Sequence, residues 1–105
     1  MTELAQRTYA LLSRVPKGKV TTYKSLGMAL GTKAYRAIGQ IMRTNPHAPE
    51  VPCHRVVASS GAIGGYMGVR EGKEISKKIA LLKSEGVNVV NGRIENFAEI
   101  LYNFS

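Results

Sequence analysis

Residues 23–43 contain two short helical patterns, whose close spacing constrains the fold more than any other feature of the chain. Thr22 is a suitable N-cap for the first helix, and Gly31 is a suitable end because glycine readily adopts a left-handed conformation. Thr32 is a suitable N-cap for the second helix, predicted over residues 33–43. Two short helices joined by a tight turn that contains glycine predict a helix-turn-helix.

The second of these helices has two contrasting faces. The residues expected to face the core follow i, i+3, i+4 and i+7 spacing and are Ala34, Ala37, Ile38 and Ile41. The opposite stripe contains only basic or amide side chains, namely Lys33, Arg36, Gln40 and Arg43. Most charged stripes are solvated faces. A stripe without an acidic residue, on the second helix of a helix-turn-helix, instead favours contacts with the phosphates and bases of a nucleic acid.

Two further helices are predicted on either side of this unit. One lies within residues 2–15, where Thr2 is a suitable N-cap. The other covers about residues 73–85 and is followed by Gly86, a suitable C-cap. Its inward-facing residues are expected to be Ile75, Ile79 and Leu82.

The rest of the chain is predicted to form loops and short extended segments. Residues 20–22 are expected to be extended, Asn91 and Gly92 give a turn signal, and residues 95–104 suit a short terminal helix. The length suits one compact domain over residues 1–105. The expected fold class is a small, mainly α domain with a winged-helix-like helix-turn-helix and short β elements.

The charge balance restricts the classes of partner. The chain has 15 Lys and Arg residues against 7 Asp and Glu residues, which gives a formal net charge of +8. This balance favours nucleic acid first and an anionic membrane surface second, although small soluble proteins can be basic without such a partner. No apolar run reaches membrane-spanning length and no signal-peptide core is present. We therefore expect an intracellular location, cytoplasmic or nuclear, and no membrane association.

The only cysteine lies in the segment VPCHRVV, residues 51–57. With two histidines it makes no convincing metal set, so no metal ion and no cofactor are expected. Cys53 is either a small buried hydrophobe or a nucleophile. A nucleophile needs a base, for which His54 is the obvious candidate. Because neighbouring side chains usually diverge, a bridging water or a backbone distortion would be needed, and a carboxylate from elsewhere should orient the imidazole.

These residues resemble a known family. The sequence PCHRV, followed by SSGAIGGY, is similar to the active-site signature of the O6-alkylguanine-DNA alkyltransferases. Residues 18–46 resemble the helix-turn-helix of that family and the asparagine loop after it, and the resemblance runs from about Gln6 to Gly86. It implies the C-terminal catalytic and DNA-binding domain alone of a direct-reversal DNA repair protein, a methylated-DNA–protein-cysteine methyltransferase that acts as a monomer on double-stranded DNA.

The resemblance also implies a reaction in which each molecule acts once. Family members bind the minor groove, flip an alkylated guanine out of the duplex and move its alkyl group onto their own cysteine. O4-alkylthymine is a further candidate substrate. By position, Cys53 would be the acceptor, His54 its water-mediated base and Glu85 the residue that orients His54. Asn45 would brace the active-site turn, and Tyr23 would donate a hydrogen bond to the leaving guanine.

Contacts with DNA and with the flipped base are implied in the same way. Arg36 would fill the gap that the flipped base leaves, and the small residues Ala37 and Gly39 would permit close approach to the groove. Met42 and Tyr66 would help to line the pocket. The remaining DNA contacts would come from Lys33, Gln40 and Arg43.

Some positions differ from the family pattern. Tyr35 and Gln40 stand where smaller residues are expected, and the segment 67–84 is longer than usual, which leaves the preferred alkyl group open. Arg55 is expected to have a structural role, through an ion pair or a bond to the backbone.

Two other functions are alternatives. A lesion sensor of the alkyltransferase-like type binds alkylated guanine without transfer, but such proteins lack the cysteine and commonly have tryptophan there. A plain helix-turn-helix regulator would leave Cys53, Asn45 and Glu85 without a role. The alkyltransferase is therefore the preferred prediction.

Overall fold

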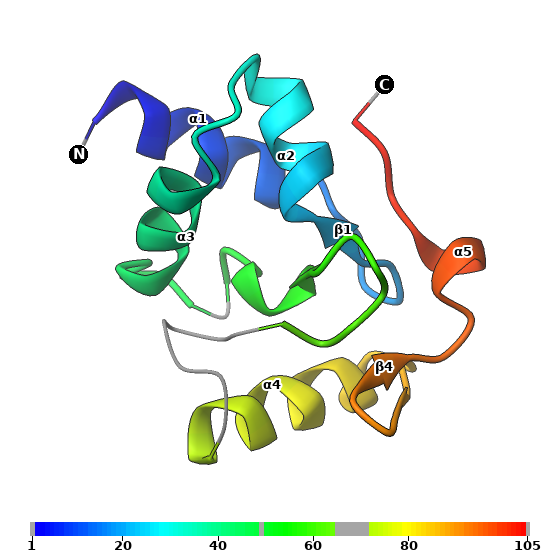
Figure 1. Ribbon diagram of the computed structural model, residues 1–105. Helices are drawn as coiled ribbons and strands as arrows, with labels where there is room; N and C mark the ends of the chain where they lie inside the picture. Colours follow the sequence, from blue (N-terminus) through cyan, green and yellow to red (C-terminus); the bar gives the residue numbers. More distant parts are fainter. Residues whose placement is uncertain (1, 49, 65–71, 105) are drawn as a thin grey trace.

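The computed structural model of the chain describes residues 2–48, 50–64 and 72–104. In chain order its elements are α1 (Glu3–Leu12), β1 (Thr21–Thr22), α2 (Tyr23–Leu30), α3 (Tyr35–Arg43), the short 3₁₀ helix η1 (Cys53–Arg55), β2 (Val56–Val57), α4 (Lys73–Ser84), β3 (Val89–Val90), β4 (Arg93–Ile94) and α5 (Phe97–Ile100). Figure 1 shows α1, α2 and α3 on one side of the segment that contains η1 and β2, with α4 on the other side. The expected mainly helical fold with short strands is confirmed.

The first helix of the helix-turn-helix, α2, begins and ends as predicted. Thr22 is its N-cap, because the threonine Oγ1 accepts a hydrogen bond from the backbone N–H of Ser25 at 3.0 Å. Gly31 ends the helix with a φ of 72°, in the left-handed region that glycine adopts without strain.

The second helix, α3, starts two residues later than predicted. The Thr32 hydroxyl accepts from the N–H of Ala34 at 3.0 Å, but α3 itself begins at Tyr35 and has no side-chain cap. The predicted start at residue 33 is therefore wrong. The reason is that the backbone N–H of Thr32 bonds back to the carbonyl of Gly27 at 2.9 Å, so the following residues are used to close the turn.

The core-facing side of α3 also differs from the prediction. Ile38 is fully buried and Met42 is 4% exposed, whereas Ala34 and Ala37 are exposed, so the prediction that these alanines face the core is wrong. Large apolar side chains set the rotation of a helix, because the methyl group of alanine buries little area. The members of the basic and amide stripe are exposed as predicted, namely Lys33, Arg36, Gln40 and Arg43.

Tyr35 closes the turn against α2. A Cβ added at Gly27 would lie 2.7 Å from Cε1 of Tyr35 and 2.8 Å from the carbonyl oxygen of Thr32. The turn can therefore approach α2 this closely only because Gly27 has no side chain. This packing gives Tyr35, which is larger than the residue expected at its position, a role within the helix-turn-helix.

Gly27→Ala is expected to lower the free energy of unfolding by about 1–3 kcal/mol, because the backbone oxygen of Thr32 cannot move away without opening the turn. Gly39→Ala is the matched control, since nothing lies within 4 Å of the added methyl group. Its better helix propensity should raise the free energy of unfolding by about 0.5–1 kcal/mol. Urea denaturation measures both. Equal stability of the two variants would contradict the close contact at Gly27.

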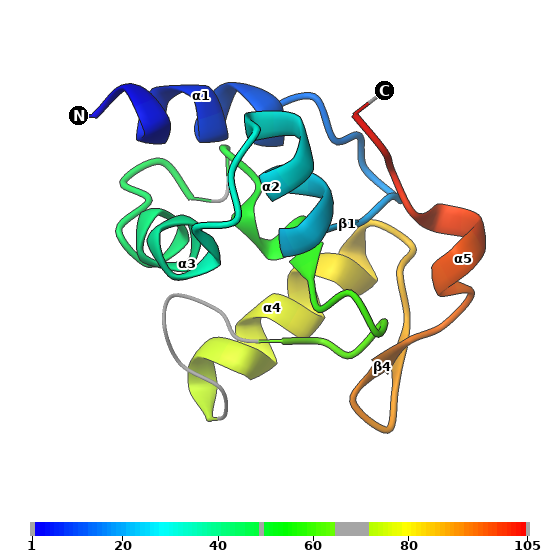
Figure 2. The ribbon, with the colours of Figure 1, turned by 45° about the horizontal axis from the view of Figure 1, so that its top comes forward.

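Strands β1 and β2 connect the helix-turn-helix to the cysteine segment. They pair in parallel, with Thr21 opposite Val56 and Thr22 opposite Val57. Because α2 starts directly after β1 and η1 ends directly before β2, this short pairing fixes the position of Cys53 relative to the helix-turn-helix. The view in Figure 2 also places the η1–β2 segment between the three N-terminal helices and α4.

Helix α4 covers the opposite side of this segment. It ends at Ser84, with Glu85 as its C-cap and Gly86 following at a φ of 87°, so the predicted end is one residue too late. Ile75 and Leu82 are buried as predicted. Ile79 is only partly buried, and a fully buried lysine, Lys78, stands in the apolar face instead.

The C-terminal part confirms the predicted turn and terminal helix. Strands β3 and β4 form an antiparallel hairpin around Asn91 and Gly92, which have positive φ values of 51° and 75°. Helix α5 lies within the range expected for it, and the residues after it return to β1, where Leu101 forms a parallel bridge with Val20. No helix within residues 2–48, 50–64 and 72–104 is long and apolar enough to cross a membrane.

Candidate active site

Cys53 lies at the start of η1, where the proline-containing loop meets β2. Its side chain is only 4% exposed and belongs to the core cluster that includes Ile38 and Met42. The N–H of Cys53 donates to the carbonyl of Val51 at 2.9 Å, which folds the backbone tightly just before the cysteine. A reaction partner must therefore bring its reacting atom to a thiol that is shielded from bulk water.

Asn45 holds the loop that leads to the cysteine. Its Nδ2 donates to the carbonyl of Val51 at 2.8 Å, and its Oδ1 accepts from the N–H of His47 at 3.0 Å. The side chain is 4% exposed, so both bonds are largely protected from water. Asn45 thus fastens the loop end next to Cys53 to the end of α3.

His54 is buried and faces a carboxylate that is distant in sequence. Its Nε2 lies 3.0 Å from Oε2 of Glu85, and the histidine is 1% exposed. Burial lowers the pKa of His54 below its ordinary value, although the hydrogen bond to Glu85 opposes this shift. The imidazole is therefore neutral at pH 7, and because a carboxylate only accepts, Nε2 must hold the proton.

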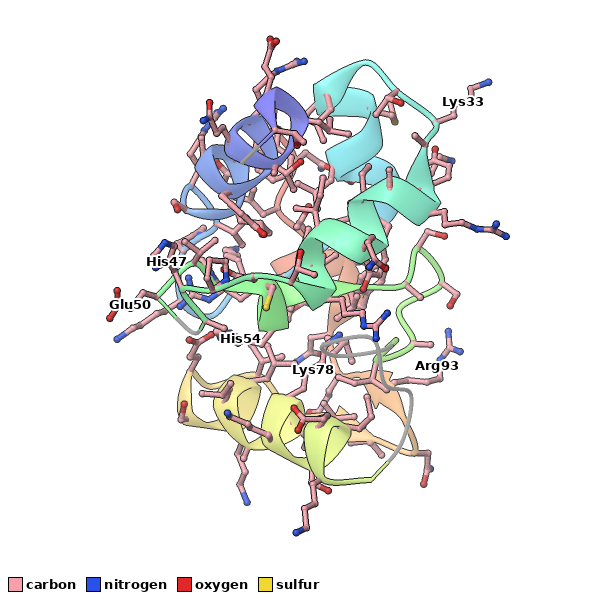
Figure 3. All side chains as sticks on the ribbon, turned by 90° about the vertical axis from the view of Figure 1, so that its left-hand side faces the viewer. Lys33, His47, Glu50, His54, Lys78 and Arg93 are labelled. Carbon is pink, nitrogen blue, oxygen red and sulfur yellow. The ribbon has the colours of Figure 1, made fainter. Side chains whose placement is uncertain are left out.

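The other ring nitrogen of His54 is consequently an unprotonated acceptor. Nδ1 is buried and has no hydrogen-bond partner among the residues that the structure describes, the thiol of Cys53 included. A buried acceptor without a protein partner is costly, and a catalytic role is one explanation for it. Figure 3 shows His54 between the η1 segment and α4. The arrangement can accept a proton close to Cys53.

Arg55 makes both kinds of contact expected for it. Its Nε and Nη2 donate to the two carboxylate oxygens of Glu85 at 2.9 and 2.7 Å, and its Nη1 donates to the carbonyl of Val15 at 2.6 Å. Burial alone would raise the pKa of Glu85, but the hydrogen bonds from Arg55 and His54 outweigh it, so the pKa is lowered. The carboxylate at the C-terminal end of α4, which the helix dipole disfavours, is thereby held ionised.

Lys78 is the residue of this site that the sequence patterns missed. Its Nζ donates to the carbonyls of Val56 and Ile63, both at 2.7 Å, and so joins β2 to the loop after it. Burial lowers the pKa of Lys78 to about 7, and the electrostatic effect of the nearby Cys53 opposes this shift in part. The sequence did contain a signal for this residue, because Lys78 has the helical spacing that places it on the same face as Ile75 and Leu82.

Tyr23 and Lys78 meet at Gly64. A Cβ added at Gly64 would lie 3.8 Å from Nζ of Lys78 and 3.9 Å from Cε2 of Tyr23. Tyr23 opens α2 and Lys78 lies in α4, so the two sides of the molecule approach each other at this glycine. The phenol ring predicted to act on a substrate and the buried amine therefore both lie close to Gly64.

The free energy of unfolding should rise with pH because of Lys78. Its folded pKa is about 7 and its ordinary value 10.5, so between these values the unfolded chain binds more protons. The contribution rises by up to about 1.4 kcal/mol per pH unit. Lys78→Met should remove this pH dependence of the free energy of unfolding, whereas Lys77→Met, at an exposed position, should leave it unchanged. Denaturation at several pH values measures this, and an unchanged slope in Lys78→Met would contradict the assignment.

The residues predicted to contact DNA lie mostly on the outer face of α3. Gly39 is half-buried and Met42 belongs to the same core cluster as Cys53, while Tyr66 lies outside the described residues. Exposed members of the set are Lys33, Arg36, Ala37, Gln40 and Arg43. Within residues 2–48, 50–64 and 72–104, no three His, Cys, Asp or Glu side chains gather in a way that could hold a metal ion.

Comparisons with known proteins identify relatives of the chain. A family model described as "6-O-methylguanine DNA methyltransferase, DNA binding domain" matches residues 3–87. The bifunctional methyltransferase/endonuclease of Picrophilus torridus is 40% identical over 95 residues, which are 89% of this chain and 30% of that protein. The methylated-DNA–protein-cysteine methyltransferase of Saccharolobus islandicus is 45% identical over 76 residues, which are 72% of this chain and 46% of that protein. The chain thus spans less than half the length of these relatives.

Two solved structures have a similar fold. S. pombe Atl1, in complex with damaged DNA containing O6-carboxymethylguanine, superposes with a TM-score of 0.81 and 28% identity over 98% of this chain and 97% of that chain. Mycobacterium tuberculosis OGT, in complex with DNA, superposes with a TM-score of 0.71 and 37% identity over 81% of this chain and 50% of that chain.

Proposed function

The chain belongs to the 6-O-methylguanine DNA methyltransferase family, and on this premise we propose that it repairs O6-alkylguanine in double-stranded DNA by moving the alkyl group irreversibly onto Cys53. One observation carries the proposal. His54, which directly follows the only cysteine in the chain, is neutral and bonds through Nε2 to Glu85 at 3.0 Å. Its other ring nitrogen, Nδ1, is buried and unprotonated and can therefore accept a proton. The name of the Saccharolobus relative supports the same chemistry.

The reaction needs a proton acceptor and a donor. Nδ1 of His54 takes the thiol proton, through a bridging water because neighbouring side chains diverge, and Glu85 stabilises the imidazolium that forms. The thiolate attacks the alkyl carbon, so that an S–C bond forms while the bond from carbon to O6 breaks. The electron pair goes to guanine, and the phenol of Tyr23 stabilises this anionic leaving group by a hydrogen bond.

The product explains why each molecule would react once. An alkyl thioether is not hydrolysed at neutral pH, so nothing regenerates the thiol of Cys53. The protein is then a stoichiometric acceptor, and the number of alkyl groups that it can remove equals the number of protein molecules. We therefore expect no turnover.

The outer face of α3 is suited to bind the duplex and to help flip the alkylated guanine toward Cys53. Its exposed stripe contains Arg36 and Arg43 and no acidic residue, and Gly39 projects no side chain toward the groove. Flipping a base costs a few kcal/mol of unstacking and unpairing. A side chain that fills the vacated position offsets part of this cost, and we assign this role to Arg36.

Arg36→Ala should therefore slow transfer from an O6-methylguanine duplex by about tenfold or more, since the cost of flipping is no longer offset. Transfer from free O6-benzylguanine, which needs no flipping, should change by less than about twofold. Single-turnover rates on the two substrates measure the difference. Equal losses on both substrates would count against the assigned role of Arg36.

The second candidate function is a lesion sensor that binds alkylated guanine without transferring the alkyl group. It is favoured by the similarity of nearly the whole chain to Atl1, which was crystallised on DNA that still contains O6-carboxymethylguanine. Cys53 favours the transferase instead, since a sensor has no need of a thiol beside a base.

One experiment separates the two functions. A duplex that contains one O6-methylguanine is incubated with a series of protein amounts, and its nucleosides are then quantified. A transferase should convert O6-methylguanine to guanine in proportion to the protein added, with no further conversion over time. Tight, lesion-selective binding without conversion would refute transfer and support the sensor.

A further inference from the structure

The hairpin of β3 and β4 lies beyond the residues matched by the family model, and it is bonded to residues 61–63, in the segment after β2. Arg93 forms an antiparallel bridge with Ala62. The N–H of Ile63 donates to the carbonyl of Gly92, and the N–H of Ile94 donates to the carbonyl of Gly61, both at 2.8 Å. The hairpin and the segment after β2 therefore form one small antiparallel unit.

The exposed end of this unit offers hydrogen-bond donors to solvent. Arg93 is exposed, and its Nη2 donates to the carbonyl of Ser60 at 2.6 Å. Arg93 forms no ion pair with any residue that the structure describes. Ser59 and Ser60 are exposed beside it, and we refer to Ser59, Ser60 and Arg93 as the hairpin tip. A guanidinium with five N–H donors and two hydroxyls are groups that proteins use to contact phosphates.

Arg93 of the hairpin tip and Lys33 of the basic stripe project in the same direction. Figure 3 shows Lys33, just before α3, and Arg93 projecting at the same edge, with α4 below both. A helix placed in a groove of duplex DNA has a phosphate backbone on either side of it. A positive side chain that lies away from the helix but projects in the same direction as its basic stripe can meet one of these backbones.

We propose that the hairpin tip binds a phosphate of the same duplex that α3 occupies. The partner is the sugar-phosphate backbone, contacted without regard to base sequence or lesion. The inference rests on the proposed function only in taking duplex DNA as the ligand of α3. Because the hairpin pairs with the segment after β2, this contact fixes the position of the duplex relative to the strand that follows Cys53.

The test compares Arg93→Gln with Lys77→Gln, which removes the same charge from the outward face of α4. Lys77 is exposed, whereas the face of α4 that packs inward contains Ile75, Lys78 and Leu82. Affinity for an undamaged duplex is measured by fluorescence anisotropy over a range of salt concentrations. Arg93→Gln should bind about tenfold more weakly and reduce the slope of log K against log salt by about one. Lys77→Gln should leave both unchanged.

Two outcomes would overturn the proposal. One is the same affinity and slope for Arg93→Gln and Lys77→Gln. The other concerns Arg93→Lys, which keeps the positive charge: its slope of log K against log salt falls as far as that of Arg93→Gln. Thermal unfolding of each variant checks that the hairpin is intact. Because the duplex has no lesion, the measured affinity does not depend on alkyl transfer. An Arg93→Gln variant with an unchanged salt slope refutes the phosphate contact of the hairpin tip. Absence of alkyl transfer refutes only the proposed function.

Discussion

Cys53→Ser is expected to abolish alkyl transfer and to leave the affinity for duplex DNA within about twofold of the original protein. A serine hydroxyl is a far weaker nucleophile than a thiol toward an alkyl carbon, because it is far less acidic and almost none of it is ionised at neutral pH. The substitution is nearly isosteric at a side chain that is 4% exposed, and it lies away from the basic stripe of α3. Binding by anisotropy and transfer from an O6-methylguanine duplex measure the two properties separately.

The control for this prediction is stability. Burying a hydroxyl without a partner costs about 1–3 kcal/mol, so Cys53→Ser should unfold at slightly lower denaturant concentration and still be folded under assay conditions. Cys53→Ala, which buries no polar group, should lose transfer to the same extent. Residual transfer in either variant would mean that another group accepts the alkyl group, and loss of binding together with transfer would indicate a folding defect.

Glu85→Gln is expected to slow transfer by about 10²–10⁴-fold. The carboxylate accepts from Nε2 of His54 at 3.0 Å and stabilises the imidazolium that forms when Nδ1 takes the thiol proton. A glutamine is neutral, and its amide can present either a donor or an acceptor to His54, so the orientation and the charge are both lost. Single-turnover rates over a range of pH measure the effect, with Gln at the exposed Glu50 as the matched control.

The same substitution has a predictable effect on stability. The pKa of Glu85 is lowered in the folded protein, so its contribution is fully present above the ordinary value of 4.5 and is lost as the pH falls through the folded pKa. Glu85→Gln should therefore be less stable at neutral pH, because Arg55 loses its charged partner, and less sensitive to acid. A Glu85→Gln variant that transfers at the original rate would show that His54 needs no carboxylate.

The sequence predicted local features better than contacts between distant residues. The cap at Thr22, the left-handed Gly31 and the Asn91–Gly92 turn depend on a few neighbouring residues, and all are as predicted. The predicted start of α3 was wrong because the N–H of Thr32 bonds to the carbonyl of Gly27 and the next residues close the turn. Tyr35 then packs next to Gly27, in a contact between helices that no local propensity contains.

The site shows the same division. The doubt that Cys53 and His54 bond directly came from the geometry of neighbouring side chains, and no such bond is present. The pairing of His54 with Glu85 came only from family resemblance, because nothing local connects residues in η1 with the end of α4. Lys78 was missed because a lysine is ordinarily placed at the surface, and its burial becomes tolerable through contacts such as its hydrogen bonds to the carbonyls of Val56 and Ile63.

The most direct test of the account is the mass of the protein itself. The protein is incubated with an O6-methylguanine duplex, and its intact mass and the mass of the Cys53 peptide are measured. We predict a gain of one methylene unit on that peptide. When the protein is in excess, the number of modified protein molecules should equal the number of lesions added. Lesion-selective binding with no gain of mass, while the thiol remains reduced, would contradict alkyl transfer by this protein.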